Sequence, residues 1–304
     1  MDDLRVILDR LEPELGRLEG EPEVLSGGIT NRNLRVTLGG DDYVLRLCGK
    51  DTEVLSIDRE TEVAATRAAN AAGVAPEVVR WLPDLHVLVT AFVPGRPMEA
   101  AELRDPATLA VVTGALRRIH DGPALPTAFP TFTLAREYGD VALARGGAVS
   151  PDDHALALEL SERIGAALKD RPGHEPVPCH NDLLTANFLR SGDDLRIVDW
   201  EYAGMGDPWF DLGNLSINHE LTPDEDAALV EAWLGRAPSR AAVARVTLMR
   251  VVSDLREAMW GVLQQAISTL DVDFVAYAAE HFDRLLDEAS SPAFERRLRL
   301  AAGG

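Results

Sequence analysis

The sequence predicts an α+β fold with two lobes, in which a small antiparallel sheet with one helix precedes a larger, mostly helical part. Apolar residues alternate in short runs between residues 23 and 92, as in strands. Helical spacing dominates beyond residue 105. Two prolines and a glycine in the stretch Val93–Pro97 indicate a connector between these regions. We therefore expect an N-terminal lobe over residues 1–93 and a C-terminal lobe over residues 94–304.

The N-terminal lobe is expected to begin with a helix over residues 3–18. Its apolar residues recur at helical spacing, and Pro13 predicts a kink or a break. Strands follow at 23–25, 34–38 and 43–47, the last two joined by a turn at Gly39-Gly40-Asp41-Asp42. A helix then runs from about Asp58 to Asn70, followed by strands near 77–81 and 86–92.

Most segments of the C-terminal lobe have helical periodicity. Helices are expected over about 105–120, 150–169, 208–219, 223–235, 239–269 and 273–289. The exception is a polar, turn-rich stretch from Pro176 to Trp200, which is expected to hold one short strand at Leu195–Val198.

Composition excludes several classes of protein. The 304 residues include 30 basic and 50 acidic side chains, a net charge of −20, which argues against a nucleic-acid partner because such binding rests on neutralising phosphates. No apolar stretch reaches the ~18 residues of a membrane helix, and the acidic N-terminus is unlike a secretory signal. Cys48 and Cys179 are too few for a disulfide framework. We expect a cytoplasmic protein with no membrane partner; its oligomeric state is not readable from the sequence.

The densest chemical signal is the run from Cys179 to Asn187. It contains His-x-Asp-x-x-x-x-Asn, the spacing of a kinase catalytic loop. Phosphoryl transfer to a hydroxyl needs a carboxylate that takes or orients the hydroxyl proton, and a neutral oxygen ligand for Mg²⁺ just behind it. Asp182 and Asn187 fit these two tasks. His180 alone would more often be a structural histidine, and the whole run could also be a polar turn.

Asp199 lies twelve residues after Asn187, at the end of the apolar strand expected at Leu195–Val198. A carboxylate at such a strand end is where a second Mg²⁺ ligand belongs. In isolation an aspartate there would more often form a turn. Following the Asp182/Asn187 pattern, Asp199 is interpreted as a metal ligand.

The N-terminal lobe supplies candidate phosphate-binding groups. A glycine-rich turn between two strands can bring amides and hydroxyls to phosphates, although a Gly-Gly turn is often only a hairpin. Arg46 is a lone base within the apolar strand Tyr43–Leu47 and needs a carboxylate partner, for which Glu62 on the following helix is the natural choice. If Arg46 instead faces solvent, it cannot be held by Glu62 as a phosphate-binding group. The candidates in the turn are Ser26, Gly27, Gly28, Thr30 and Asn31.

These motifs resemble the choline/ethanolamine kinase branch of the aminoglycoside-phosphotransferase-like, protein-kinase-like fold. The resemblance rests on LSGGITNRNLRV, YVLRLCGK, IDRETE, GVAPEVV, CHNDLLTANFL, IVDWEYAGMGDPWFDLGN and WGVLQQAISTLDVDFVAYAAEHFDRL, which span residues 25 to about 285. Arginine at position 46, where protein kinases carry lysine, also looks like the choline kinases.

The resemblance implies ATP- and Mg²⁺-dependent phosphorylation of a hydroxyl on a small cationic amino alcohol. ATP would lie between a nucleotide-binding N-terminal lobe and a catalytic C-terminal lobe, its adenine against the segment that includes Thr90 and Phe92. Asp182 would be the base or hydroxyl-orienting group, and Asn187 and Asp199 the Mg²⁺ ligands. Asp211 matches an aspartate that braces the catalytic loop. This role is compatible with a position in the first turn of a helix, where the helix dipole stabilises an acid.

For the acceptor, the resemblance implies an aromatic and acidic cage around a cation. Tyr202, Trp260 and Tyr277 match its rings, although each alone would more often be a core aromatic. Glu257 stands where the family often has a second tryptophan, and Asn218 where it may place an acid. A cage with an added carboxylate and one fewer aromatic ring suits a primary amine, which donates hydrogen bonds, better than trimethylated choline. Glu257 could equally be a solvated helix residue paired with Arg256 or Arg250.

Two other functions remain open at this point. The first is a phosphotransferase on the same fold that acts on another small alcohol, such as an aminoglycoside, thiamine or an amino sugar. The second is a non-catalytic relative that binds nucleotide or amine, which would be expected to lack Asp182, Asn187 or Asp199. All three residues are present here.

Overall fold

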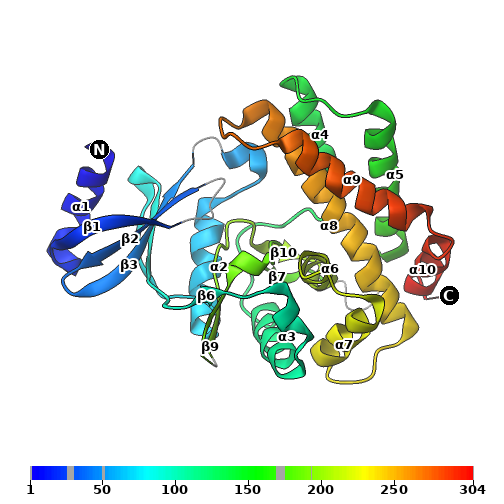
Figure 1. The fold of residues 1–304 in the computed structure, drawn as a ribbon, viewed down its shortest axis with the longest axis horizontal. Coiled ribbons are helices and arrows are strands. Elements are labelled where there is room, and N and C mark those ends of the chain that lie inside the picture. Colours follow the sequence, from blue (N-terminus) through cyan, green and yellow to red (C-terminus); the bar gives the residue numbers. More distant parts are fainter. Residues whose placement is uncertain (1, 26–30, 50–51, 169–174, 193, 304) are drawn as a thin grey trace.

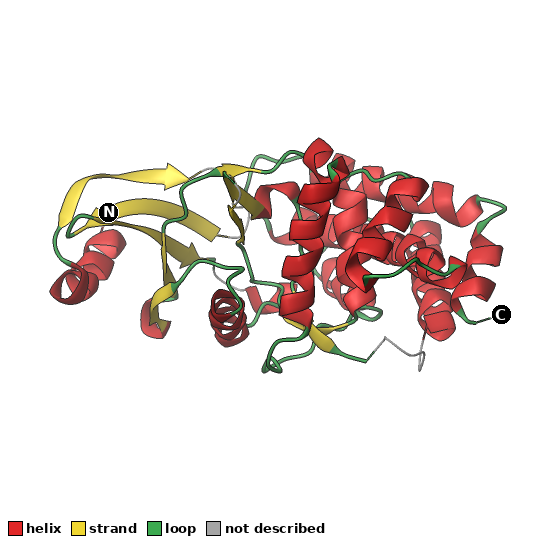
Figure 2. Cartoon of the chain, turned by 90° about the horizontal axis from the view of Figure 1, so that it is seen from below, coloured by secondary structure: helices red, strands yellow, loops and turns green. Residues whose placement is uncertain are grey.

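A computed structural model describes residues 2–25, 31–49, 52–168, 175–192 and 194–303, and the structural statements below refer to these residues. Figures 1 and 2 show two lobes side by side along the long axis, a sheet-containing N-terminal lobe and a helical C-terminal lobe. The predicted two-lobed α+β class is confirmed.

The N-terminal sheet is antiparallel throughout, with the strand order β1-β2-β3-β5-β4. One face is covered by α1, whose Ile7 and Leu11 are buried against Leu34, Val36 and Leu45 of the sheet. The strands are β1 (Leu18–Leu25), β2 (Asn31–Leu38), β3 (Asp41–Cys48), β4 (Val78–Leu82) and β5 (Val87–Ala91), and the helices are α1 (Asp2–Leu15) and α2 (Arg59–Ala71). Because β3 and β5 are neighbours, their side chains share one wall of the space between the lobes.

Two details of this lobe differ from the expectation. Strand β1 starts at Leu18, five residues before the predicted strand. The prediction missed this part because Glu19 to Pro22 carry no apolar alternation. This edge strand faces water and shifts register between Glu19 and Glu23, so proline is tolerated there. Pro13 does not break α1 at once; it lies in the last turn, and the helix ends at Leu15.

Helix α2 links the two lobes. It begins at the N-cap Asp58, whose carboxylate accepts a hydrogen bond of 2.7 Å from the Thr61 amide. Its Ala65 and Ala69 belong to the hydrophobic core of the C-terminal lobe rather than to that of the sheet. The helix therefore carries Glu62 at the boundary between the lobes.

The C-terminal lobe is built around α8 (Arg240–Ile267), which is buried almost continuously from Val251 to Gln264 and packs against α4, α6 and α9. The other helices are α3 (Pro106–His120), α4 (Leu134–Ala144), α5 (Pro151–Leu168), α6 (Pro208–Asn218), α7 (Pro223–Leu234), α9 (Phe274–Ser290) and α10 (Phe294–Ala301). The sequence reasoning did not predict α4 or α10, since α4 lies between proline- and glycine-rich segments and α10 is short and basic.

The stretch from residue 176 to 200 contains more structure than the single strand expected. Short strands β7 (Val177–Cys179), β8 (Phe188–Ser191) and β9 (Asp194–Ile197) occur there, with a 3₁₀ turn, η4 (Thr185–Asn187). β8 pairs with β6 (Arg96–Pro97) and β9, and β7 pairs with β10 (Gly204–Gly206). Strands of two to four residues are too short to show a period of two.

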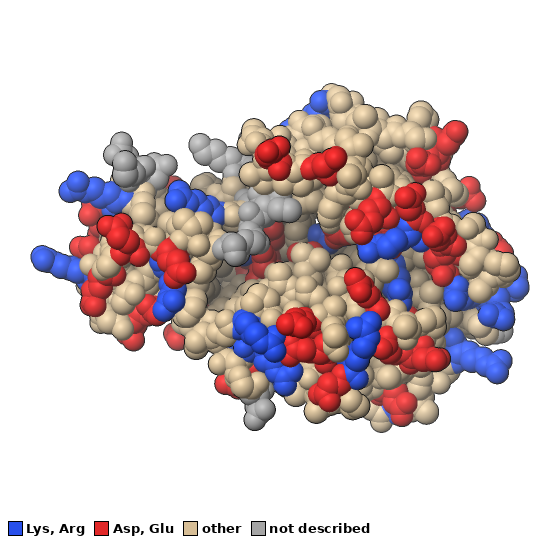
Figure 3. Space-filling model, in the orientation of Figure 1, with Lys and Arg blue, Asp and Glu red and all other residues tan. Residues whose placement is uncertain are grey.

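Figure 3 shows acidic and basic side chains interspersed over both lobes on the face in view, with a hollow between the lobes. No helix among the described residues has the length and apolar character needed to cross a membrane.

Candidate active site

The segment after β7 forms a tight loop whose backbone is held by buried side chains. Asp211, from α6, accepts the amides of His180 at 3.0 Å and Asn181 at 2.7 Å, and Asn214 accepts the amide of Leu183 at 2.5 Å. Asn181 has a positive φ of 65°, which a loop held this firmly can impose on a residue other than glycine. These contacts are what the predicted bracing role of Asp211 requires.

His180 connects this loop to the segment that carries Asp199. Its Nδ1 accepts the Asp182 amide at 3.2 Å, and its Nε2 lies 3.0 Å from the Val198 carbonyl oxygen. Burial lowers the pKa of His180, so the neutral ring with the proton on Nε2 fits both contacts. His180 thus connects the loop that carries Asp182 to the segment that carries Asp199.

The three residues predicted for catalysis and metal binding converge. The Nδ2 of Asn187 donates to the Asp182 backbone carbonyl at 2.8 Å, which leaves its Oδ1, the atom that binds cations, for other partners. Asp199, with a positive φ of 64°, lines the same cavity as Asn187. Two carboxylates and one amide oxygen form the hard donor set that Mg²⁺ prefers, so the residues present fit this ion.

The carboxylate of Asp182 lies near one cation, Arg256, and near two other carboxylates, Glu257 and Asp199. Burial raises its pKa to about 7, against the lowering effect of the Arg256 guanidinium, while Glu257 and Asp199 raise it further. Arg256 contacts Oδ1 at 3.2 Å, whereas Oδ2 has a long contact of 3.5 Å with Asn187. Oδ2 is therefore the oxygen available to a hydroxyl proton.

Arg46 lies across the cavity from this loop and is 8% exposed. It forms the expected ion pair with Glu62 at 2.9 Å, and it also bonds to Asp199 and lies 3.3 Å from Glu201. Burial disfavours its charge, but the three carboxylates outweigh this and raise the pKa of the guanidinium. Arg46 thus faces the interior, and the solvated alternative is wrong.

Two members of this ion network were missed by the sequence reasoning. Arg59 contacts Glu62 at 2.7 Å and Glu201 at 3.1 Å, so that arginines of the N-terminal lobe meet carboxylates of the C-terminal lobe. The i, i+3 spacing of Arg59 and Glu62 on one helix was an available signal. The side chain of Asn31 bonds to Glu201 at 2.8 Å and accepts from Arg59 at 3.0 Å.

The cavity between the lobes has a volume of about 350 Å³. The segment expected to receive the adenine, Thr90 to Val93, lies on its wall, together with Leu25, Val44 and Leu88 of the sheet and Leu189 of β8. Arg46, Glu62, Asn187 and Asp199 line its polar end. Ser26, Gly27, Gly28 and Thr30, predicted to contact phosphates, lie outside the described residues.

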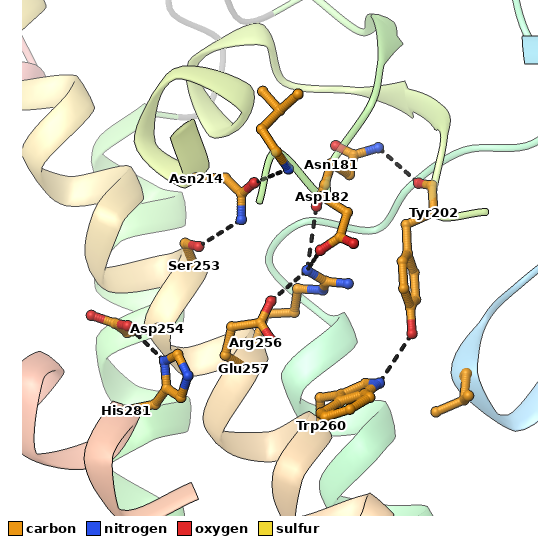
Figure 4. A network of polar contacts seen from close by, with 12 residues as sticks. Asn181, Asp182, Tyr202, Asn214, Ser253, Asp254, Arg256, Glu257, Trp260 and His281 are labelled. Atoms are coloured by element: carbon orange, nitrogen blue, oxygen red, sulfur yellow. Dashed lines mark hydrogen bonds and ion pairs between the residues drawn. The ribbon is translucent and has the colours of Figure 1, made fainter. Parts of the chain in front are cut away.

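The residues predicted to hold the acceptor form one cluster, with Glu257 and Trp260 on α8, Tyr277 on α9 and Tyr202 on the loop before β10. Figure 4 shows Tyr202, Glu257 and Trp260 near Asp182. The indole N–H of Trp260 donates to the Tyr202 hydroxyl at 3.0 Å, and the rings of Trp260 and Tyr277 meet edge to face at 5.5 Å. Gly261 permits this approach, because a Cβ there would lie 2.9 Å from the Tyr277 ring.

Glu257 is buried, so the solvated interpretation of this residue is wrong. It pairs with Arg256 at 2.6 Å and not with Arg250, and its Oε2 accepts the Tyr277 hydroxyl at 2.7 Å. Arg250 instead binds Asp226 at 3.0 Å. Arg256, which bonds to Asp182, was not predicted as a site residue; its adjacency to Glu257 on the long helix was the available signal.

A second cluster among the described residues brings a histidine, a cysteine and an aspartate close enough together to hold a metal, namely His120, Cys179 and Asp211. Both oxygens of Asp211 already accept hydrogen bonds from the catalytic loop, and His120 Nε2 lies 3.0 Å from one of them. We assign this cluster to bracing the loop.

Comparison with known proteins agrees with this geometry. A model of the phosphotransferase enzyme family matches residues 21–244. The crystal structure of a choline/ethanolamine kinase family protein from Mesorhizobium loti is 32% identical, with a TM-score of 0.84 over 99% of this chain and 100% of that one. Human ethanolamine kinase 1 is 25% identical over 91% of this chain and 69% of its own length. Choline kinase LicA from Streptococcus pneumoniae shares the fold, with 20% identity and a TM-score of 0.77 over 94% of this chain and 98% of that one.

The family model covers well over half of the chain, and the Mesorhizobium loti protein aligns with it from end to end. The chain is therefore a kinase that belongs to the phosphotransferase enzyme family and, within it, to the choline/ethanolamine kinase family.

Proposed function

We propose that this kinase transfers the γ-phosphoryl group of ATP to the hydroxyl of a small amino alcohol of the choline or ethanolamine type, with Mg²⁺ as cofactor. The observation that carries the proposal is a convergence of three residues: Asn187 and Asp199 line the cavity together with Arg46, and the side chain of Asn187 donates to the backbone carbonyl of Asp182. Its relatives support the acceptor class, since they include ethanolamine kinases and choline kinases.

In this proposal the nucleotide occupies the cavity, with its base against the segment Thr90 to Val93 and its phosphates toward Arg46. The guanidinium of Arg46 neutralises phosphate charge, and Glu62 holds it in place from the helix behind. Asn187 and Asp199 hold Mg²⁺, which when bound neutralises charge on the phosphates and orients them.

Asp182 acts on the acceptor. Its Oδ2 accepts the proton of the attacking hydroxyl, while Arg256 and the backbone contacts of the loop hold the carboxylate in one orientation. With a pKa of about 7, this carboxylate can take up that proton near neutral pH. The amine of the acceptor lies near Glu257, in the cluster that this carboxylate forms with Tyr202, Trp260 and Tyr277.

The experiment is a screen for acceptor-dependent ADP release over ethanolamine, choline, thiamine and aminoglycosides. We expect release with amino alcohols, and a loss of roughly 10²-fold or more in kcat for Asp182→Asn with nucleotide binding retained. Asp194→Asn is the matched control, because Asp194 is a largely exposed aspartate in the neighbouring hairpin.

The possible results separate the parts of this proposal. Release that depends on thiamine or an aminoglycoside and not on amino alcohols would assign the chain to another acceptor. Full turnover by Asp182→Asn would remove that residue from the chemistry. Undiminished turnover after chelation of divalent cations would contradict the metal role of Asn187 and Asp199.

A further inference from the structure

The aromatic rings expected to enclose a quaternary ammonium already contact one another and an internal cation. Figure 4 shows Tyr202, Trp260 and Arg256 of this cluster. The guanidinium carbon of Arg256 lies 4.3 Å from the centre of the Tyr202 ring. Trp260 bonds to the Tyr202 hydroxyl and packs edge to face against Phe274 and Tyr277, at 5.8 and 5.5 Å. Tyr202 is 5% and Trp260 7% exposed, so neither ring offers an open face.

Arg256 is fixed in this position by its ion pairs. It is 3% exposed, and its Nη1 bonds to Glu257 at 2.6 Å, to Asp182 at 3.2 Å and to the Asn181 carbonyl at 3.3 Å. A quaternary ammonium that displaced it would bring a positive charge but no N–H donor, so two buried carboxylates would lose hydrogen bonds, which is a costly exchange. The guanidinium therefore occupies the cation–π position on Tyr202 and is held there by its ion pairs.

The two kinds of amine make different demands on such a site. A quaternary ammonium has no N–H and depends on ring faces for its stabilisation. A primary ammonium has three donors and forms short, charge-assisted hydrogen bonds to carboxylates. With Asp182 in its ionised form, Asp182 and Glu257 carry two negative charges against the single positive charge of Arg256, so one negative charge remains for an incoming ammonium.

We propose that Arg256 closes the quaternary-ammonium position on Tyr202 and, with Glu257 as the ammonium acceptor, makes this site select amino alcohols whose nitrogen carries hydrogens. This inference rests on the proposed function and names the acceptor more narrowly. Selection arises from a repulsive element, the fixed cation, as well as from an attractive one, the carboxylate.

The test is a methylation series of acceptors with the wild-type chain of 304 residues. Initial rates of ADP release are measured with ethanolamine, N-methylethanolamine, N,N-dimethylethanolamine and choline. We expect kcat/KM to fall along the series and to be at least tenfold lower for choline than for ethanolamine, with most of the change in KM.

Two variants assign the selectivity to the two side chains. Arg256→Met, which keeps the length of the side chain without its charge, should narrow the ethanolamine/choline ratio to below threefold by lowering the KM for choline. It should also lower kcat for both acceptors equally, since Asp182 loses a partner. Glu257→Gln should raise the KM for ethanolamine about tenfold and leave the KM for choline within threefold.

Arg250→Met is the matched control. Arg250 lies on the same helix and pairs with a buried aspartate, but it does not contact the three rings. Its loss should leave the ethanolamine/choline ratio unchanged, even where the melting temperature falls.

Three results would overturn the inference. The first is a wild-type kcat/KM for choline equal to or above that for ethanolamine. This result would overturn the inference even if Arg256→Met failed to fold. The second is an unchanged ratio in folded Arg256→Met or an unchanged ethanolamine KM in Glu257→Gln. The third is ADP release with another class of alcohol and with none of the four amines, which refutes the proposed function and this inference together.

Discussion

The bracing of the catalytic loop by Asp211 can be tested with Asp211→Asn. This carboxylate is fully buried; it accepts the amides of His180 and Asn181 on its two oxygens, and His120 Nε2 lies 3.0 Å from one of them. Asparagine keeps the shape but has one acceptor oxygen. Whichever way its amide turns, at least one loop N–H faces an NH₂ group and loses its acceptor.

The expected cost follows from these contacts. A buried donor without a partner costs about 1–3 kcal/mol, and each remaining bond loses about 1 kcal/mol when its acceptor becomes neutral. We therefore expect a loss of about 3–5 kcal/mol in the free energy of unfolding. At roughly 2 °C per kcal/mol for a chain of this size, the melting temperature should fall by about 6–10 °C.

The assay pairs thermal unfolding with steady-state ADP release. Because the loop carries Asp182, kcat should fall about tenfold or more while the KM for ATP changes less than threefold. Asp226→Asn is the control, since Asp226 is 1% exposed and bonds to Arg250 and Ser216 away from the loop. It should destabilise the fold without lowering kcat. The bracing argument is refuted if Asp211→Asn loses stability and keeps its kcat, or if it changes neither.

Further predictions concern the ion network and a buried histidine. Arg46→Met should raise the KM for ATP about tenfold and lower the free energy of unfolding by about 3 kcal/mol, because Asp199 loses its cation and the buried Glu62 and Glu201 keep only Arg59 as a cation; an unchanged KM would remove Arg46 from the nucleotide site. A double-mutant cycle of Arg59→Met and Glu201→Gln, measured by urea unfolding, should give a coupling of about 0.5–3 kcal/mol between the lobes; strict additivity would contradict the 3.1 Å ion pair. Burial and, less strongly, Arg104 lower the pKa of His219 to about 4. The unfolded chain takes up this proton near pH 6.5 and the folded chain does not, so stability should fall between pH 7 and pH 5 by about 2 kcal/mol more in the wild type than in His219→Leu; equal pH slopes would show that the histidine does not contribute.

The sequence allows the fold and much of the candidate site to be predicted where residues are tied to a local pattern. Apolar periodicity predicts the sheet and the long helices, and the spacing of Asp182 and Asn187 predicts a loop of the kinase type, in which the structure shows Asn187 bonded to the Asp182 carbonyl. Arg46 and Glu62 were paired correctly because a charge inside an apolar strand needs a partner on the next helix.

What could not be predicted depends on contacts between distant segments. Glu201 meets Arg59 across 142 residues, and Arg256 meets Asp182 across 74. The local signals at Arg59 and Arg256 indicate neighbours on their own helices and not these distant partners. Short strands such as β6 and β10 exist because a neighbouring strand supplies their hydrogen bonds, so their own two or three residues carry no detectable period.

The composition of β1 has a consequence for the behaviour of the N-terminal lobe in concentrated solution. This strand closes the sheet on one side and presents its outer backbone groups to water, which makes such an edge a template for a strand from another molecule. Glu19, Glu21 and Glu23 repel a similar strand, Pro22 removes an amide, and the shifted register bends the edge. Part of the strongly acidic composition thus guards an open sheet edge against aggregation.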